Sequence, residues 1–397
     1  MKILVVCQYY YPENFQITPI CEALVVEGYD VTVLTGLPNY PNGLVPEEYR
    51  MGHRKEIING VKVIRCYEKG RQKGMIGLAL NYGSFVFSAM RKINHFHTDY
   101  DLVFCYQLSP VTMAIPAMKF AKKNDIPFLI YCCDLWPESM KMYVSSERNP
   151  AFKIVSSISK KIYCSAERII VQSKSFEDYL VRMHEIKKEK IVYIPAFADE
   201  AYLTQDFTPE DEVVDFVFLG NLGIAQDLFS VLGAINEIKY VSNYKVHFVG
   251  DGVCLDDMKD YVKKNGLGRI VEFHGRRPVE EMPKFYKLAD ACIVSLKAGN
   301  ATGLTLPSKV QGYMAAGKPI FAMIEGSAQE VINDAGCGVC VDASDRKALA
   351  AAMKDFIEHK DKYQNCGDKG RKYFMEHFTK AEFVKRIKVE LETFAVK

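Results

Sequence analysis

The chain has 397 residues, of which 49% are hydrophobic and 25% are charged, and its formal net charge is +2. This length fits two domains of about 200 residues each, and the composition is that of a soluble globular protein with enough apolar residues for two cores. A net charge so close to zero, without a strongly basic domain, excludes nucleic acid as a partner.

The first half of the chain alternates short apolar segments with amphipathic ones. Strand-length segments rich in β-branched and aromatic residues are KILVVCQ, YDVTVLT, VKVIRCY, YDLVFCY, PFLIYCCD and RIIVQS. Helical patterns such as ITPICEALVVEG and VTMAIPAMKFAKKN lie between several of them. Continuous apolar strands alternating with helices predict an α/β fold with a doubly wound parallel sheet covered on both faces.

The opening residues and the cysteines bear on the compartment. MKILVVCQYY predicts a buried first strand and not a secretory signal. The 12 cysteines are scattered through strand-like segments, so we expect buried, reduced thiols in a cytosolic protein and no disulfide framework. The eight histidines show no metal-ligand spacing with cysteine or acidic residues, so no metal site is expected.

The segment from Gly74 to Met90 contains no charged residue, but Lys69, Arg71, Lys73, Arg91 and Lys92 bracket it. Its 17 residues are marginal for a membrane-spanning helix. A buried helix and a helix lying in the membrane interface both remain open. Between residues 51 and 98 there are nine Lys or Arg against two Asp or Glu, an excess that favours contact with an anionic membrane surface.

Residues Asp134 to Ser139 read DLWPES and directly follow the apolar segment PFLIYCC. The motif contains the only tryptophan of the chain, beside two carboxylates, at the predicted carboxyl end of a strand. Ligands of open parallel sheets bind outside the carboxyl ends of the strands, which makes this motif a candidate site. A helix-capping aspartate followed by a structural Trp-Pro pair is the alternative.

The strand and helix alternation restarts after a polar, acidic stretch, IVYIPAFADEAYLTQDFTPEDEVV, which we interpret as an inter-domain linker. The second series of strands is VDFVFLG, KVHFVGDG, RIVEFHG, ACIVSL, PIFAMI and GVCVD. We predict one domain over residues 1–198 and a second over 199–378. A last amphipathic helix is predicted within residues 379–397.

Glycine-rich turns mark the ends of three strands in the second half: FLGNLG (218–223), FVGDG (248–252) and FHGR (273–276). The longest motif, GLTLPSKVQGYMAAGKPIFA, runs from Gly303 to Ala322. It predicts a helix that begins at Ser308 and Lys309. Free N–H groups, the positive end of the helix dipole and one ammonium group make such a start an anion site.

The Gly303–Ala322 motif closely resembles the signature segment of family 4 glycosyltransferases with the GT-B fold. The tracts QYYYPENF, TGLPNYP and DLWP resemble a subgroup that builds bacterial O-antigen, capsule and related surface glycans. The resemblance covers essentially the whole chain. It implies two Rossmann-like domains facing a cleft, with the acceptor bound by 1–198, the nucleotide sugar bound by 199–378, and the last helix packed on the N-terminal domain.

The resemblance also implies the site residues. Lys309 would be the catalytic residue that stabilises the leaving diphosphate, with Asp134 and Glu138 orienting acceptor or donor. On the acceptor side we expect Gln16, Asn39, Tyr40 and Trp136. The nucleotide sugar would be held by Gly220, Asn221, Gly223, Gln226, Gly250, Asp251, His274, Arg276, Asn300, Thr302, Leu306, Pro307, Ser308, Lys309 and Gln311.

The chain departs from the family pattern in two places. Many members carry an arginine and a lysine at the FLGNLG turn, where this chain has Asn221 and Gln226. The family also commonly shows two glutamates separated by seven residues, which contact the donor sugar and the ribose. Their positions fall on Leu304 and Gly312 here, so Asn300, Thr302 or Gln311 would have to make the contacts with the donor sugar and the ribose instead.

The resemblance implies a retaining, metal-independent transferase acting at the inner face of the cytoplasmic membrane. It would move a sugar, an N-acetylated hexose or a deoxyhexose, from a UDP-sugar to a polyprenyl diphosphate-linked glycan, with no cofactor. No Asp-x-Asp motif of a metal-dependent enzyme is evident. A nucleotide-sugar 2-epimerase and a non-catalytic partner of another transferase remain alternatives. UDP release that occurs only when an acceptor is supplied would distinguish a transferase from an epimerase. Turnover by the isolated protein would exclude a non-catalytic partner.

Overall fold

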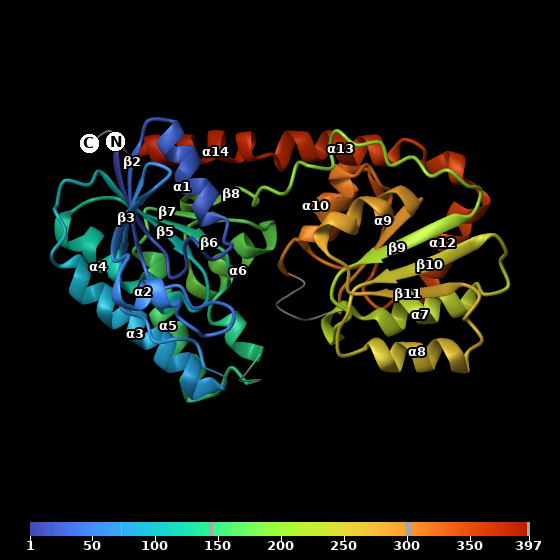
Figure 1. The fold of residues 1–397 in the computed structure, drawn as a ribbon, viewed down its shortest axis with the longest axis horizontal. Helices are drawn as coiled ribbons and strands as arrows, with labels where there is room; N and C mark the ends of the chain where they lie inside the picture. The colour runs from blue at the N-terminus through green and yellow to red at the C-terminus, as the bar shows by residue number, and fades with distance from the viewer. Residues whose placement is uncertain (73, 143, 145, 298–303, 395–397) are drawn as a thin grey trace. The chain divides into compact units, whose positions relative to one another are not determined.

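The computed structural model describes the chain except for residues 73, 143, 145, 298–303 and 395–397 (Figure 1). The chain divides into two compact units. Unit 1 consists of Met1–Ile194 together with Val384–Lys397, and unit 2 is Pro195–Phe383.

Unit 1 is built on an eight-stranded sheet in the order β3-β4-β2-β1-β5-β6-β7-β8. The edge pair β3–β4 is antiparallel, and the other pairs are parallel. The strands are β1 (Lys2–Val6), β2 (Asp30–Thr35), β3 (Lys55–Ile58), β4 (Val61–Arg65), β5 (Leu102–Gln107), β6 (Phe128–Cys132), β7 (Arg168–Val171) and β8 (Ile191–Tyr193). The predicted inter-domain linker therefore begins too early. Its first residues, Ile191–Tyr193, form strand β8, because their β-branched side chains favour a strand that extends the sheet.

Helices cover both faces of this sheet (Figure 1). They are α1 (Ile17–Val26), α2 (Glu47–Met51), α3 (Met75–Ile93), α4 (Ile115–Asn124), α5 (Pro150–Cys164), α6 (Lys174–His184) and, from Val384 onward, α14 (Lys380–Thr393). The C-terminal part of α14 contacts the rest of unit 1. Arg168 pairs with Glu390 at 2.7 Å, and the Tyr29 hydroxyl donates to Glu392 at 2.7 Å.

Unit 2 is built on a six-stranded parallel sheet in the order β11-β10-β9-β12-β13-β14. Its strands are β9 (Val214–Leu219), β10 (Tyr244–Val249), β11 (Val271–Gly275), β12 (Ala291–Ser295), β13 (Ile320–Met323) and β14 (Gly338–Val341). Its helices are α7 (Leu228–Glu237), α8 (Leu255–Lys264), α9 (Met282–Leu288), α10 (Ser308–Ala315), α11 (Ser327–Ala335), α12 (Arg346–Glu358) and α13 (Cys366–His377). The predicted architecture of two doubly wound α/β sheets is confirmed.

Alternate side chains of the unit 2 strands enter two separate cores, one on each face of the sheet. Phe216 and Phe218 of β9 pack with residues of α7, α8 and α12. Val217 and Leu219, which point the opposite way, pack with residues of α9, α10, α11 and α13. Burial on both faces explains why these strands are nearly continuous apolar runs in the sequence.

The turns after β9 and β10 bring backbone against backbone. Gly220 and Gly250 have φ values of +134° and +150°, which L-residues with side chains rarely adopt. A Cβ atom at Gly250 would lie 1.8 Å from the carbonyl oxygen of Gly220. Glycine is therefore required at position 250 for two reasons, backbone conformation and the close approach of the neighbouring turn.

Replacing Gly250 by alanine should separate these two reasons when it is compared with Gly266→Ala. Gly266 also has a positive φ, of +70°, but no atom lies within 4 Å of its would-be Cβ. We expect Gly266→Ala to lose about 1–2 kcal/mol of unfolding free energy from backbone strain alone. Gly250→Ala should lose a further ~1–3 kcal/mol from overpacking. Urea denaturation measures both, and equal losses would contradict the tight approach of the two turns.

Candidate functional site

A cavity of about 780 Å³ lies at the carboxyl ends of β9, β10 and β11 in unit 2. Five residues predicted from the sequence line it: Gly220, Asn221, Gly250, Asp251 and Arg276. The structure adds Val249, Gly252, Val253, Arg277 and Met282. The strand-end turns therefore converge as a parallel sheet requires, and they supply two guanidinium groups beside glycine backbone.

Lys309, the second residue of α10, extends toward the turn after β9. Its Nζ would lie 3.4 Å from a Cβ built on Gly220. It donates a hydrogen bond of 2.5 Å to Oε1 of Gln226, and it lies 3.9 Å from the ring centroid of Phe218. The structure thus brings together Lys309, Gln226 and Gly220, which the sequence predicts to act at one site.

Among the described residues, the recorded partners of the Lys309 ammonium group carry no negative charge. One is an amide oxygen of Gln226 and the other is the ring of Phe218. Burial lowers the pKa of Lys309 to about 7. An anion that reached this ammonium would therefore gain a strong electrostatic interaction, because little solvent screens the charge.

The start of α10 lies directly before Lys309. Ser308 is exposed and is the first residue of the helix, and the N-cap residue is Pro307, whose side chain cannot accept a hydrogen bond. Leu306 and Pro307 are half-buried. Two further predicted donor ligands, Asn300 and Thr302, lie outside the described residues.

At one of the two positions where the family carries a glutamate, a neighbouring side chain fills the space. Gly312 lies in α10, and a Cβ atom there would be 2.9 Å from the hydroxyl oxygen of Tyr286. Tyr286 therefore occupies the space that a longer side chain at 312 would enter. Gln311, a proposed substitute, is buried and donates to the carbonyl oxygen of Ala196 at 2.7 Å.

His274 of β11 points to the face of the sheet that is covered by α9. Among the described residues, the cavity lining includes Arg276 but not His274. Side chains alternate along a strand, so Phe273 stacks on Phe248 in one core while His274 turns to the other face against Phe285. Burial, and then the nearby His247, lower the pKa of His274. A role of His274 in nucleotide binding stays a prediction.

In unit 1 the DLWPES motif follows β6. Burial raises the pKa of Asp134, and hydrogen bonds from Ser109 oppose this shift. The indole nitrogen of Trp136 donates to the hydroxyl of the same Ser109 at 3.0 Å. Glu138 forms an ion pair with Lys141 at 3.0 Å. Ser109, at the end of the neighbouring strand β5, therefore ties the motif to the sheet.

The predicted acceptor-side residues differ in exposure. Tyr40 is 45% exposed, and its ring lies 5.3 Å from Phe15 and 5.5 Å from Tyr9. Asn39 is buried, and its side-chain oxygen accepts from Asn81 at 3.2 Å. Gln16 is the N-cap residue of α1. Asn39 therefore shapes the loop that presents Tyr40, and a direct contact of Asn39 with a ligand remains a prediction.

A buried polar cluster beneath this loop escaped the sequence analysis. Gln8 and Asn81 each donate to Oε1 of Glu68 at 2.8 Å. Burial raises the pKa of Glu68 to about 8, and the hydrogen bond from Gln8 opposes this. The one sequence signal was Asn81, a polar residue inside the uncharged segment. The cluster holds together the ends of β1 and β4 and helix α3.

The protonation of Glu68 should make the stability of the protein depend on pH. Its folded pKa lies above the unfolded value of about 4.3, so the folded state keeps a proton that the unfolded chain releases. The free energy of unfolding should fall by up to about 1.4 kcal/mol per unit between about pH 5 and pH 8. Glu68→Gln should lack this decline in urea titrations, whereas the exposed control Glu189→Gln should keep it. If the free energy of unfolding changes with pH in the same way for wild type and Glu68→Gln, Glu68 is already ionised in the folded protein over this pH range.

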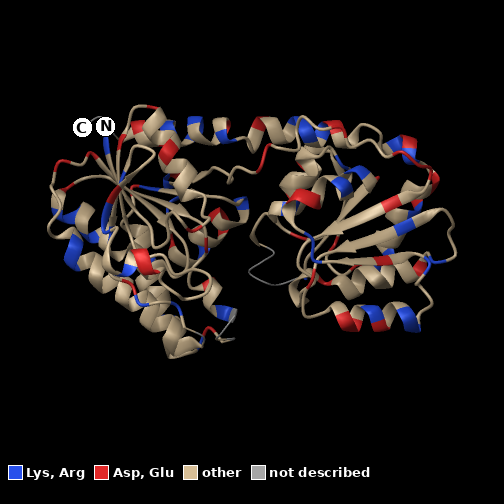
Figure 2. Ribbon diagram, in the orientation of Figure 1, with Lys and Arg blue, Asp and Glu red and all other residues tan. Residues whose placement is uncertain are grey.

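Helix α3 has one buried face and one exposed apolar face. Gly77, Asn81, Phe85, Ala89 and Ile93 are buried at four-residue intervals. Ile76 is 79% exposed and Phe87 is 65% exposed. Figure 2 shows the helix almost without charged residues. The helix therefore has one core face and one exposed apolar face, so both the core-helix and the membrane-interface interpretations stay open. Among the described residues no helix has the length and apolar character needed to cross a bilayer.

Two hollows flank α3. An apolar groove of about 840 Å³ runs between α3, Trp136 and α4, and Phe87 and Lys119 are among its lining residues. A second pocket of about 540 Å³ shares Phe87 and is basic, with Arg54, Arg91, Lys92 and His95 among its lining residues. Lys73, predicted to flank the helix, lies outside the described residues.

Comparisons with known proteins cover nearly the whole chain. The model for "Glycosyltransferase Family 4" matches residues 16–202, and the model for "Glycosyl transferases group 1" matches residues 203–373. The "Probable glycosyltransferase WbjE" of Pseudomonas aeruginosa is 27% identical over 62% of this chain and 63% of its own length. The "Putative colanic acid biosynthesis glycosyl transferase WcaI" of Escherichia coli K12 is 22% identical over 90% of this chain and 92% of its own length.

Solved structures share the fold. Sucrose-phosphate synthase from Thermosynechococcus elongatus has a TM-score of 0.73 at 18% identity, with both chains covered completely. HepE from Anabaena, in complex with UDP and glucose, has a TM-score of 0.67 at 15% identity, over 99% of this chain and 100% of its own. At these identities the structural likeness establishes the architecture.

Proposed function

The chain belongs to the family 4 glycosyltransferases with the GT-B fold, and we propose that it transfers a sugar from a UDP-sugar to a lipid-linked glycan with retention of configuration. The product would be part of a bacterial surface polysaccharide. The names of WbjE and WcaI support the class of pathway, and the UDP bound by HepE supports the nucleotide. The sugar would be an N-acetylated hexose or a deoxyhexose.

The observation that carries this proposal is the buried ammonium of Lys309 beside the Gly220 turn. We infer that the diphosphate of the donor lies between this ammonium, the backbone of the turn and the start of α10. These groups would stabilise the negative charge that grows on the leaving diphosphate as the sugar–phosphate bond breaks. No divalent cation would then be needed at the phosphates. Asp134 and Glu138 would orient acceptor or donor.

UDP affinity should depend on pH through Lys309. The ammonium form binds a diphosphate, but burial lowers the pKa of Lys309 to about 7 in the unliganded protein. Affinity should therefore fall by up to tenfold per unit as pH rises from about 7 to about 9. The terminal phosphate of UDP is already ionised over this range, given a phosphate second pKa of about 6. In calorimetric titrations Lys309→Met should bind more weakly and without this slope. The same slope in both proteins would contradict the role of Lys309.

Removal of the ammonium should slow transfer more than it affects folding. Loss of one group that stabilises the leaving diphosphate costs about 2–4 kcal/mol, which corresponds to a fall in kcat/KM of about 30-fold to 1000-fold for Lys309→Ala. The assay follows acceptor-dependent UDP release with a polyprenyl diphosphate-linked glycan. Lys284→Ala, a change at a side chain that is 75% exposed on α9, is the control. UDP release without acceptor would favour an epimerase, and equal rates in wild type and Lys309→Ala would refute the assigned step.

For the acceptor we propose that unit 1 docks on the cytoplasmic face of the membrane through α3. The apolar side chains of Ile76 and Phe87 would enter the interface, while Arg91 and Lys92 would attract anionic headgroups. Each basic residue near such a surface contributes about 1 kcal/mol, so docking would be reversible. A lipid-linked substrate would then be presented to the enzyme at the surface in which it resides.

Co-sedimentation with vesicles tests the docking. Wild type should pellet with anionic vesicles at low salt and less so as salt is raised, because the Debye length falls to about 10 Å at 0.1 M. Changing Lys69, Arg71, Arg91 and Lys92 to glutamine should leave the protein in the supernatant. Lys122→Gln with Lys123→Gln, on the exposed end of α4, removes two charges away from α3 as a control and should still pellet. If the variant with all four charges removed pellets as well as wild type, docking through α3 is contradicted.

A further inference from the structure

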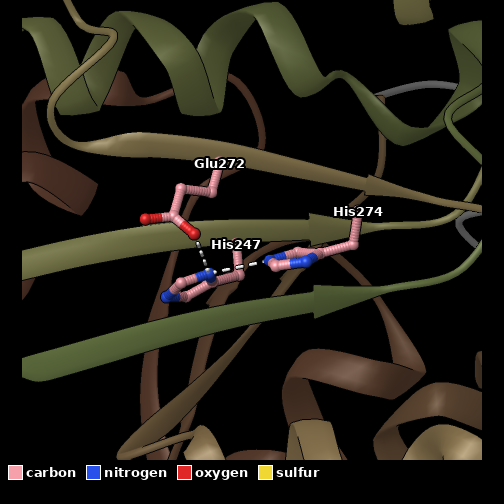
Figure 3. Close-up of side chains that lie close together, drawn as sticks. All are labelled: His247, Glu272 and His274. Carbon is pink, nitrogen blue, oxygen red and sulfur yellow. Dashed lines mark hydrogen bonds and ion pairs between the residues drawn. The ribbon is translucent and has the colours of Figure 1, made fainter.

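A cluster of metal-ligand side chains lies in unit 2 on the face of the sheet that carries Val217 and Val249. His247 of β10 and Glu272 and His274 of β11 each offer one donor atom, and these atoms all lie within 4.8 Å of one another. Figure 3 shows the two imidazole rings and the carboxylate turned toward one another from neighbouring strands. Nδ1 of His247 lies 2.9 Å from Nε2 of His274 and 3.7 Å from Oε2 of Glu272.

The register of two strands creates this cluster. His247 is the direct parallel partner of Glu272, and His274 is two residues further along β11. The register shifts beside His274, because Phe248 pairs with Phe273 whereas Val249 pairs with Gly275. The ring of His274 nevertheless lies on the face of His247, with the two ring centroids 5.2 Å apart. Their neighbours Phe248 and Phe273 stack on each other in the opposite core.

A buried carboxylate orients the central histidine. Oδ1 of Asp215, on the adjacent strand β9, lies 2.7 Å from Nε2 of His247, and both side chains are 4% exposed. Asp215 accepts the proton of Nε2, which leaves the lone pair of Nδ1 directed at His274 and Glu272. A carboxylate behind a histidine is the usual outer partner of a metal-ligating imidazole, because it fixes the tautomer and the ring orientation.

We propose that His247 Nδ1, His274 Nε2 and Glu272 Oε2 bind a divalent transition cation of the zinc class, with Asp215 orienting His247. Tetrahedral zinc has ligand bonds of about 2.0–2.1 Å, which places its ligand atoms roughly 3.3 Å apart. The separations of 2.9 Å and 3.7 Å lie on either side of that value, and all three donor atoms lie within 4.8 Å of one another, so side-chain rotation would have to bring them to the tetrahedral spacing. Two imidazole nitrogens select zinc, cobalt or nickel over magnesium or calcium. Water would complete the coordination.

Lys245 also contacts the cluster and is compatible with a cation. Its ammonium lies 2.6 Å from Oε1 of Glu272, which leaves Oε2 for the metal. The cation would tie β10 to the edge strand β11, just before the turns that carry Gly250 and Arg276. This role is structural and does not depend on the proposed sugar transfer. Without a cation, the same groups would form a hydrogen-bond chain from His274 through His247 to Asp215.

Cobalt titration of the tag-free, chelator-treated full chain distinguishes the two arrangements. We expect the visible d–d bands of tetrahedral Co²⁺ to saturate at one equivalent and to disappear when Zn²⁺ is added. Zn²⁺ at about a hundredfold excess over its Kd should raise the melting temperature by about 5–10 °C, whereas Mg²⁺ should not.

Variants assign the ligands. His274→Ala and Glu272→Gln, at half-buried positions, should remove or shift the Co²⁺ bands, and His359→Ala, at an exposed histidine in unit 2, should leave them unchanged. Asp215→Asn should keep the bands but weaken Co²⁺ affinity by about 10-fold to 100-fold. If wild type shows no tetrahedral bands and no Zn²⁺-dependent melting shift, or if the bands persist in His274→Ala, the cluster is a hydrogen-bond chain and the proposal fails.

Discussion

The proposed donor site in unit 2 depends on one desolvated ammonium group, that of Lys309. Lys309 extends from the start of α10 to the Gly220 turn, where its partners are an amide oxygen and an aromatic ring. Burial that lowers its pKa to about 7 makes the charged form roughly 5 kcal/mol less favourable than in water. A diphosphate would relieve that penalty on binding. A fixed charge in a site with little water also needs no reorganisation as the leaving group develops its own charge.

The glycine turns make this arrangement sterically possible. Gly250 packs on the carbonyl of Gly220, and Nζ of Lys309 lies at van der Waals distance from the position of a Cβ atom at Gly220. The parallel sheet brings these turns to one edge, so the cavity follows from topology and from glycines at fixed positions. Asn221 and Gln226 stand where many family members carry charges, so in the proposed donor site more of the electrostatic interaction with the diphosphate would come from Lys309. Tyr286, beside Gly312, closes the space of a missing glutamate.

Much of the fold could be predicted because buried parallel strands are continuous apolar runs and their ends are marked by glycine. Strand β3 was missed because KEII is a short, partly exposed edge strand, and β8 was missed because it is three residues long and precedes a polar stretch. The convergence of Gly220, Gly250 and Arg276 was predictable from strand ends alone. The cluster of His247, Glu272 and His274 was not, because it depends on the register between two strands, which spacing along the chain does not contain. The exposed face of α3 likewise depends on what packs beside it.

The central claim is that protein groups stabilise the leaving diphosphate in place of a metal ion. The most direct measurement is acceptor-dependent UDP release by wild type in excess EDTA, followed by addition of Mg²⁺ or Mn²⁺. The account predicts turnover in EDTA and no gain on adding either cation. EDTA would also remove a cation from the cluster of His247, Glu272 and His274, so only rescue separates the two sites. Rescue by Mg²⁺ would not act through the cluster, because its donor set does not suit Mg²⁺. Turnover that disappears in EDTA and returns with Mg²⁺ or Mn²⁺ would contradict the account.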